Sequence, residues 1–214
     1  TNGNWDTPQT VTLTGVNDAI VDTDTQTNVT ISVTDASSND EFDALADQTV
    51  TVTTTDNETA AFTKSETTQT VTEGAGTDTF TLVLGAQPAG DVVLRVTSAD
   101  TGEVTVGVAD YTFTNGNWDT PQTVTLTGVN DTIVDTNTET TVTIAVVDAS
   151  SNDEYDNVAN QTVTVTTTDN ETAAYTKSET ARTVTEAGGT ATFTLVLNAQ
   201  PATDVVLGVV SADT

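Results

Sequence analysis

The chain has 214 residues, of which 32 are acidic and only four are basic, so its formal net charge is −28. A chain of this charge repels the phosphates of nucleic acids, and we expect no nucleic-acid partner. Cysteine and histidine are both absent, which excludes disulfide bonds and disfavours zinc and copper sites.

The sequence repeats itself. Residues 1–101 recur without a gap as residues 114–214, a shift of 113 residues at which 81 of 101 positions are identical. A period of this length indicates a string of whole domains, because solenoid units usually have about 20–50 residues. We therefore divide the chain into the C-terminal half of one repeat (1–58), a complete repeat (59–170) and the N-terminal half of the next (171–214). Two interpretations of these halves stay open: an arbitrary cut through an array, or strands exchanged between chains of a fibre.

Threonine accounts for 54 residues, and β-branched side chains favour strands. Within the complete repeat, alternation of apolar and polar residues predicts seven strands, at 61–72, 79–84, 91–97, 111–114, 122–127, 140–147 and 162–168. Gly, Pro, Asn and Asp lie between them, as turns require. We expect an all-β fold of tandem immunoglobulin-like, seven-strand antiparallel β-sandwiches. No stretch reaches the roughly 18 apolar residues of a membrane helix, so we expect no membrane insertion of this segment.

The acidic residues follow the topology of such a sandwich. The loops after the first, third and fifth strands and the end of the seventh lie at one pole, and all four carry acids: Glu73; Asp100, Glu103 and Asp110; Asp131 and Asp135; Asp169 and Glu171. Six to eight oxygen ligands in flexible loops are what Ca²⁺ prefers. The pattern predicts a calcium site at this pole, although Asp and Asn also occur in loops simply because they suit turns.

Four short motifs make the complete repeat resemble a Calx-beta domain. They are Val-Thr-Glu-Gly at 71–74, Ala-Asp-Tyr at 109–111, Val-Asn-Asp-Thr-Ile-Val-Asp at 129–135 and Thr-Asp-Asn-Glu at 168–171. That family is a calcium-binding sandwich repeated in bacterial surface adhesins and found in sodium–calcium exchangers and integrin subunits. The resemblance implies calcium ligands at Glu73, Asp110, Asp131, Asp135 and Asp169, with the backbone carbonyl of Ile133. The candidate set also includes Asn130, Glu171 and the corresponding or junction residues of the partial repeats, Asp18, Ile20, Asp22, Asp56, Glu58 and Glu186.

This sequence departs from the family at three acidic positions. The paired aspartates of the family's acidic loop are Asn130-Asp131 here, a later acid is Thr138, and the closing aspartates are Asp-Asn-Glu at 169–171. Fewer charged ligands suggest one or two ions bound with an affinity on the order of 10⁻⁴–10⁻³ M, as in extracellular modules.

The connection between repeats is very short, because the last strand ends at Thr168 and apolar residues resume at Ala173. Calcium bound at such a junction would set its stiffness. We therefore expect a non-enzymatic, calcium-stabilised stalk or filament segment of a large extracellular bacterial surface or secreted adhesion protein. Its partners would be neighbouring repeats, and in a fibre other copies of the chain. The alternatives are a self-assembling surface fibre or layer subunit, and a repeat that binds ice or a glycan through threonine ranks or through Trp5 and Trp118.

Overall fold

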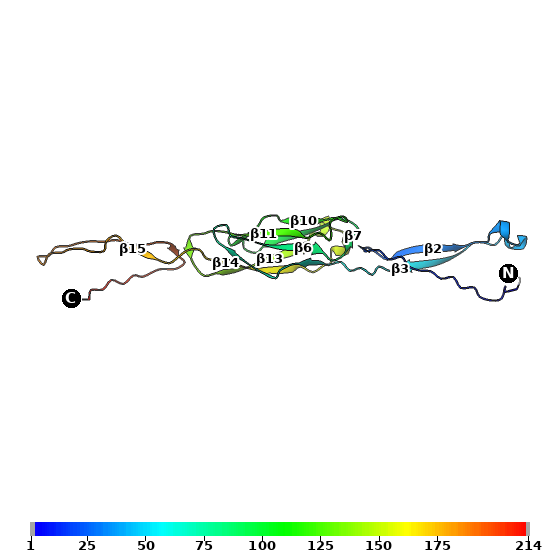
Figure 1. The fold of residues 1–214 in the computed structure, drawn as a ribbon, viewed down its shortest axis with the longest axis horizontal. Helices are drawn as coiled ribbons and strands as arrows, with labels where there is room; N and C mark the ends of the chain where they lie inside the picture. The colour runs from blue at the N-terminus through cyan, green and yellow to red at the C-terminus, as the bar shows by residue number, and fades with distance from the viewer. Residues whose placement is uncertain (1–2, 213–214) are drawn as a thin grey trace.

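A computed structural model describes residues 3–212 as an elongated molecule, with a β-sandwich in the middle and a thinner segment extending from each end (Figure 1). Four short 3₁₀ turns occur in this part of the chain: η1 (Asp35–Ser37), η2 (Asp40–Phe42), η3 (Asp148–Ser150) and η4 (Asp153–Tyr155). Between residues 3 and 212, no helix has the length and apolar character needed to cross a bilayer.

Two sheets form the central sandwich. One has four strands in the order β4 (Phe62–Lys64), β6 (Thr77–Leu84), β11 (Gln122–Gly128) and β9 (Val104–Val106). The other has five, in the order β10 (Asp110–Phe113), β8 (Val92–Ser98), β13 (Thr138–Val146), β14 (Gln161–Thr168) and β5 (Thr68–Thr72). All neighbours are antiparallel except β14 and β5, which are parallel. The predicted all-β, immunoglobulin-like sandwich is thereby confirmed.

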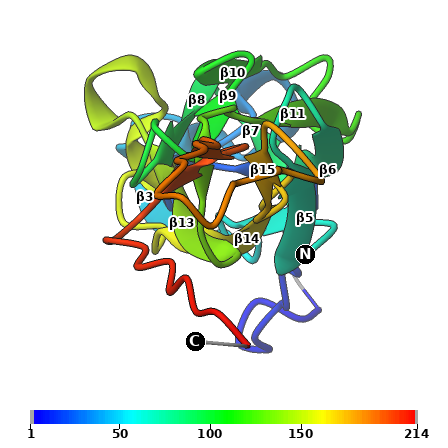
Figure 2. The ribbon, with the colours of Figure 1, turned by 90° about the vertical axis from the view of Figure 1, so that its left-hand side faces the viewer.

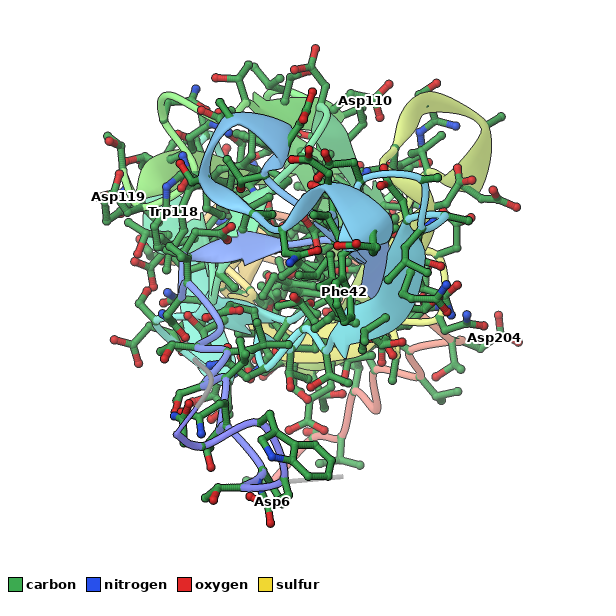
Figure 3. The ribbon with its side chains drawn as sticks, turned by 90° about the vertical axis from the view of Figure 1, so that its right-hand side faces the viewer. Asp6, Phe42, Asp110, Trp118, Asp119 and Asp204 are labelled. Carbon is green, nitrogen blue, oxygen red and sulfur yellow. The ribbon has the colours of Figure 1, made fainter. Side chains whose placement is uncertain are left out.

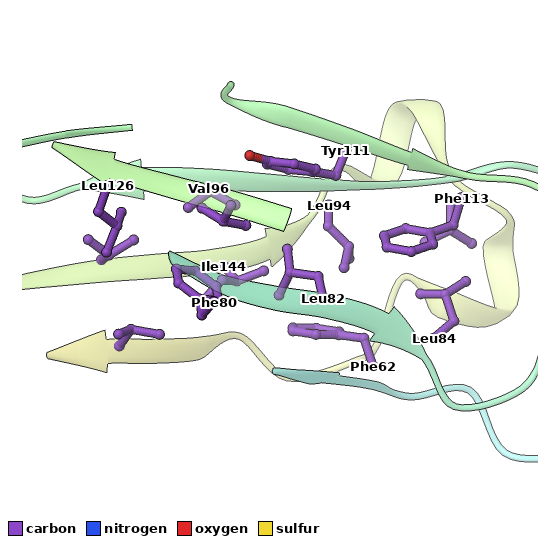
Figure 4. Close-up of a cluster of buried hydrophobic side chains, with 14 of the residues drawn as sticks. Phe62, Phe80, Leu82, Leu84, Leu94, Val96, Tyr111, Phe113, Leu126 and Ile144 are labelled. Atoms are coloured by element: carbon purple, nitrogen blue, oxygen red, sulfur yellow. The ribbon is translucent and has the colours of Figure 1, made fainter. Parts of the chain in front are cut away.

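The core lies between the two sheets because each strand alternates inward apolar and outward polar residues. In β6, Phe80, Leu82 and Leu84 are buried, while the residues between them are partly exposed. The facing strand β13 contributes Val142 and Ile144. Figure 4 shows Leu82, Leu84 and Ile144 packed together with Phe62, Leu94 and Phe113, and this packing fixes the two sheets relative to each other.

The structure corrects the prediction of one continuous first strand over 61–72. The chain forms β4 in one sheet, crosses at Ser65–Thr67, and continues as β5 in the other. The crossing is held on both sides, since Ser65 and Thr81 exchange hydrogen bonds of 3.0 and 2.9 Å and Thr164 N–H donates to the Thr67 carbonyl at 3.0 Å. Strand β9 was also not predicted. The sandwich therefore has nine strands instead of seven.

The end segments are close in sequence to parts of the sandwich, but within the described residues each pairs only two of its own strands, as a hairpin. In the first, β2 (Thr25–Ile31) pairs with β3 (Gln48–Thr54); in the last, β15 (Tyr175–Lys177) pairs with β16 (Leu195–Leu197). We call residues 3–58 the N-terminal half-repeat and residues 171–212 the C-terminal half-repeat.

Each half-repeat is joined to the sandwich by a short parallel bridge. In the first junction β1 (Ile20–Val21) pairs with β7 (Gln87–Pro88), and in the second β12 (Ile133–Val134) pairs with β17 (Gln200–Pro201). The two bridges are the same structure displaced by one 113-residue period. Val21 is only 3% exposed and belongs to the core of the sandwich that follows it. Viewed along the long axis, β15 projects in front of the middle of the sandwich (Figure 2), so successive repeats follow one axis.

Candidate metal centre

The turn between β5 and β6 buries a glutamate at the end of the sandwich that faces the next repeat. Glu73 is 7% exposed, and its backbone N–H donates to the Thr168 carbonyl at 3.1 Å. The turn is tight because Gly74 has a φ of 75° and because Gly128 packs directly against the backbone of Thr72, where a β-carbon would collide. These contacts hold the Glu73 carboxylate against the end of β14.

Four more carboxylates meet Glu73. One oxygen each of Glu73, Asp131 and Glu171 lie within 4.8 Å of one another, and the same holds for Glu73, Asp135 and Asp169. The two groups share Glu73, so five carboxylates form one cluster. They come from the β5–β6 turn, the loop before β13 and the chain leaving β14.

The cluster is short of positive charge and of hydrogen-bond donors. The Oε2 atoms of Glu73 and Glu171 are buried without a hydrogen-bond partner. Burial, followed by the charge of Asp131, raises the pKa of Glu73. Burial, together with hydrogen bonding to Asp169 and Glu73, raises the pKa of Glu171 to about 7. Carboxylates brought together in this way disfavour their own ionised forms.

Backbone N–H groups hold part of the cluster in place. Ile133 N–H donates to Asp131 Oδ1 at 2.7 Å, and Asp135 N–H donates to Asp169 Oδ2 at 3.3 Å. Glu171 N–H donates to Asp169 Oδ1 at 2.9 Å, and such bonds lower the pKa of Asp169. The loop and the start of the next repeat are thereby tied to one carboxylate.

These residues fit a hard divalent cation. The donors are carboxylate oxygens from three segments, two of those oxygens have no other partner, and carboxylates and carbonyls are the ligands that Ca²⁺ takes. A bound cation would supply the positive charge that the cluster lacks. The chain has no cysteine or histidine to offer zinc.

The first junction repeats the arrangement without the buried glutamate. Ile20 N–H donates to Asp18 Oδ1 at 2.9 Å, Asp22 N–H to Asp56 Oδ2 at 3.2 Å and Glu58 N–H to Asp56 Oδ1 at 3.3 Å. Each bond has its counterpart 113 residues later. The candidate residues of the first junction are Asp18, Ile20, Asp22, Asp56 and Glu58, and these bonds link them as their counterparts are linked at the second junction. The four acids among them line one small pocket.

Three of the candidate ligands lie elsewhere or have other partners. The structure corrects the placement of Asp110 among the ligands. Asp110 lies within β10, and its two carboxylate oxygens accept from Arg95 Nε and Nη2 at 2.7 and 2.8 Å. This ion pair across the outer surface holds it away from the cluster. Glu186 is exposed in the C-terminal half-repeat and joins no acidic group among the described residues. Asn130 lies beside the cluster, but its Oδ1 accepts from Asn170 Nδ2 at 2.9 Å.

Glu103 also lies at this pole, outside the predicted ligand set. Burial, then the charges of Asp100, Asp135 and Asp131, raise its pKa. Its carbonyl accepts from Val129 N–H at 2.9 Å, which fixes it beside the acidic loop. Its position in the loop after the third predicted strand is the sequence feature that indicates this placement. Glu103 is therefore one of the acidic residues that surround the cluster.

Comparison by sequence finds no protein family and no curated protein that matches the chain. Solved structures share a limited likeness. The apo-form Calx CBD1 domain is 13% identical with a TM-score of 0.41, covering 53% of this chain and all of that domain. Domains 4 and 5 of the S-layer protein SbsC are 24% identical with a TM-score of 0.37, covering 57% of this chain and 52% of that one. The Caenorhabditis elegans MSP-domain-like protein SSP-19 is 17% identical with a TM-score of 0.36, covering 50% of this chain and 98% of that one.

Proposed function

We propose that this chain is a calcium-stabilised spacer, in which the cation both stabilises each sandwich and stiffens its connection to the next. One observation carries the proposal. Asp131 and Asp135, two members of the carboxylate cluster, flank Ile133 and Val134, the two residues that bridge to the following repeat. The loop that would hold the ion is therefore also the loop that makes the inter-repeat contact.

Contacts other than the ion also join the two repeats at the junction. Val134 lies against the following half-repeat, and its counterpart Val21 is buried in the core of the complete sandwich. The N–H groups of Gln87 and Gln200 donate to the carbonyls of Ala19 and Thr132 at 3.2 and 3.1 Å. A cation that orders the loop would thus restrict bending between repeats, and a row of such junctions would act as a stiff stalk.

An extracellular location, on a bacterial surface or in a secreted filament, suits this mechanism. Extracellular modules bind Ca²⁺ with dissociation constants of about 10⁻⁴–10⁻³ M, a range in which the surroundings keep the site filled. The proposed role is mechanical. The spacer would set the distance between the cell and the target that an adhesive part of the same protein binds. We propose no enzymatic activity for this chain.

The glycan alternative receives less support from the complete repeat. Trp118 packs against the hydrophobic core, and its backbone carbonyl accepts from Leu84 N–H at 3.1 Å. Figure 3 shows Trp118 beside Asp119 at the edge of the view along the long axis. A tryptophan that packs on the core offers less of its ring to a sugar than a fully exposed one does.

Thermal unfolding of the chain in calcium and then in chelator tests the proposal. A ligand that binds only the folded state adds RT ln(1 + [L]/Kd), or about 2.7 kcal/mol at a concentration of 100 Kd. For a domain of this size we expect a rise in Tm of about 10 °C. The double variant Asp131→Ala, Asp135→Ala should lose that rise. The double variant Asp6→Ala, Asp119→Ala, which removes two exposed acids also related by the repeat, should keep it. Equal Tm values for the unaltered chain in both conditions would remove calcium from the account.

A further inference from the structure

The chain enters the complete sandwich at one end and leaves it at the other (Figure 1). It enters through β4 and β5, which run towards the turn at Glu73, and it leaves through β14, which ends beside that turn. A tension along the chain therefore pulls the start of β4 towards the preceding repeat and the end of β14 towards the following one. The way in which these strands are joined decides how the sandwich resists that tension.

The entering and leaving strands lie side by side and run in the same direction. β5 and β14 are parallel, with five residue pairs from Thr68–Thr164 to Thr72–Thr168. Parallel neighbours start at one pole and end at the other, so tension pulls β5 backwards and β14 forwards along their own axes. All the hydrogen bonds between the two strands are then loaded together, in shear. Two strands pulled apart from the same pole would lose their bonds one pair at a time.

Hydrogen bonds close this ladder at both of its ends. At the start, Thr164 N–H donates to the Thr67 carbonyl at 3.0 Å. At the end, Glu73 N–H donates to the Thr168 carbonyl at 3.1 Å, and the Thr168 hydroxyl donates to the Val71 carbonyl at 3.2 Å. The two strands are therefore joined over the whole length of β5.

The short strand β4 adds a second sheared pair ahead of this ladder. Its three residues pair with β6, and Gly85 N–H donates to the Ala61 carbonyl at 2.8 Å just before the strand begins. Gln161 Nε2 donates to the Phe62 carbonyl at 2.6 Å, which ties the start of β14 to β4. Phe62 and Val71 are each 2% exposed, so sliding β4 or β5 along its axis also displaces a closely packed core side chain.

We propose that the β5–β14 pair is a mechanical clamp, which makes the repeat resist unfolding when the chain is under tension. This inference rests on the proposed spacer role, because only a chain held at both ends bears load, but the clamp itself needs no calcium. Its strength comes from the direction of pulling, since the same bonds broken in sequence yield at a lower force. Forced unfolding is governed by the unfolding rate, so the clamp acts on that rate under load.

The carboxylate cluster lies at the pole where tension leaves the sandwich. Glu73 directly follows β5, and Asp169 and Glu171 follow β14. An oxygen of Glu73 lies within 4.8 Å of one oxygen from each of the other two carboxylates. A cation bound there would join the ends of the two sheared strands and oppose their sliding. Strands pulled apart from the opposite pole would reach that cation last, so calcium would strengthen the clamp only in shear.

Single-molecule force measurements on the full chain, pulled in two directions, test the proposal. The chain has no cysteine, so two introduced cysteines set the direction. Handles at Thr67→Cys and Thr172→Cys pull β5 and β14 from opposite poles, whereas handles at Thr67→Cys and Asn160→Cys pull them from the same pole. All three side chains are exposed. In chelator, at one loading rate, we expect a several-fold higher unfolding force from opposite poles. Equal forces, or a lower force from opposite poles, would overturn the clamp.

Repeating both pulls in calcium separates the clamp from the proposed role of calcium. We expect calcium to raise the force from opposite poles and to leave the force from the same pole unchanged. A force from opposite poles that is several-fold higher in chelator but does not respond to calcium would support the clamp and contradict the calcium-stabilised spacer. Equal forces in the two directions would remove the clamp, whatever the response to calcium.

Two neighbouring proline variants test the ladder itself. The register and the alternation of ladder bonds direct the Gln69 N–H towards β14, whereas the Thr70 N–H points away and donates to Asp78 Oδ2 at 3.3 Å. β5 is an edge strand, where proline is tolerated if its missing N–H faces away from the neighbouring strand. Gln69→Pro should therefore lower the force from opposite poles towards that from the same pole, and Thr70→Pro should leave it nearly unchanged. Equal losses in the two variants would contradict the role of the ladder.

Discussion

Glu171, the first residue beyond the Asp169-Asn170 closing pair, brings a carboxylate oxygen to within 4.8 Å of one from the buried Glu73 in the β5–β6 turn. Each has an Oε2 atom without a hydrogen-bond partner. Two adjacent carboxylates of this kind repel each other unless a proton or a cation lies between them. We therefore expect the stability of the folded state to respond both to pH and to a divalent cation.

Glu73→Gln should separate these two effects. The amide removes a negative charge from the cluster, so the variant should melt a few degrees higher than the unaltered chain in chelator. In calcium the order should reverse, because a ligand shared by both acidic groups has been lost. Calorimetry in the two conditions checks the prediction. A variant that is less stable in both would show that Glu73 serves packing alone.

The pH dependence in chelator follows from the raised pKa of Glu171, which burial and its acidic neighbours bring to about 7. A carboxyl whose folded-state pKa exceeds its unfolded value binds more protons when folded, so its contribution to stability is present below about pH 4.5 and is lost as the pH rises towards about 7. The raised pKa values of Glu73 and Glu103 act in the same direction.

We therefore expect the chelated chain to be more stable at pH 5 than at pH 8. Calcium should reduce or reverse that difference, because the cation competes with the protons. Denaturant unfolding at both pH values checks this. Greater stability at pH 8 in chelator would contradict the raised pKa values.

Asp110→Asn should leave the calcium response unchanged, in contrast to the sequence-based assignment. Asp110 is exposed and paired with Arg95 on the surface of the five-stranded sheet. Removing an exposed ion pair costs about 0.2–1 kcal/mol, and the loss should be equal with and without calcium. A selective loss in calcium would return Asp110 to the ligand set.

Ala75→Gly should stabilise the β5–β6 turn. Ala75 has a φ of 75°, a left-handed conformation that costs a non-glycine residue about 1–2 kcal/mol. The corresponding residue in the next repeat is Gly188, with a φ of 85°. After the greater unfolded-state entropy of glycine is subtracted, the net gain should be at most about 1 kcal/mol. Gly74→Ala is the matched opposite: it should destabilise the turn, because a β-carbon there would lie 2.9 Å from Asn170 Nδ2. Equal stabilities of the two variants would exclude backbone strain as the cause.

Period-two alternation was sufficient to find the long strands. β6, β8, β11, β13 and β14 each begin and end within two residues of their predicted bounds. The prediction of one strand over 61–72 was wrong because the chain changes sheets within it. Threonines face outward in both sheets, so the sequence of residues 63–72 does not show where the change occurs. The short β9 has only three residues, too few for a periodic signal.

The acidic cluster was predictable in outline because topology alone brings the relevant loops to one pole. Asp110 was misplaced because the family motif locates a residue in sequence, whereas its partner Arg95 lies on a neighbouring strand and depends on register. The bridge from Ile133 and Val134 to the next repeat could not be predicted either, since a two-residue parallel contact leaves no pattern in the sequence.

Pulsed electron paramagnetic resonance across the second junction tests the central claim most directly. Spin labels at Thr141→Cys in β13 and Thr176→Cys in β15 report the distance between neighbouring repeats, and labels at Thr141→Cys and Thr112→Cys report a distance within the sandwich. All three positions are exposed, and the chain has no other cysteine. At concentrations where the chain is monomeric, we predict a narrow distribution across the junction in calcium and a broad one in chelator, with the control distance unchanged. Equally narrow or equally broad distributions across the junction in both conditions would contradict the proposal that a cation stiffens the array.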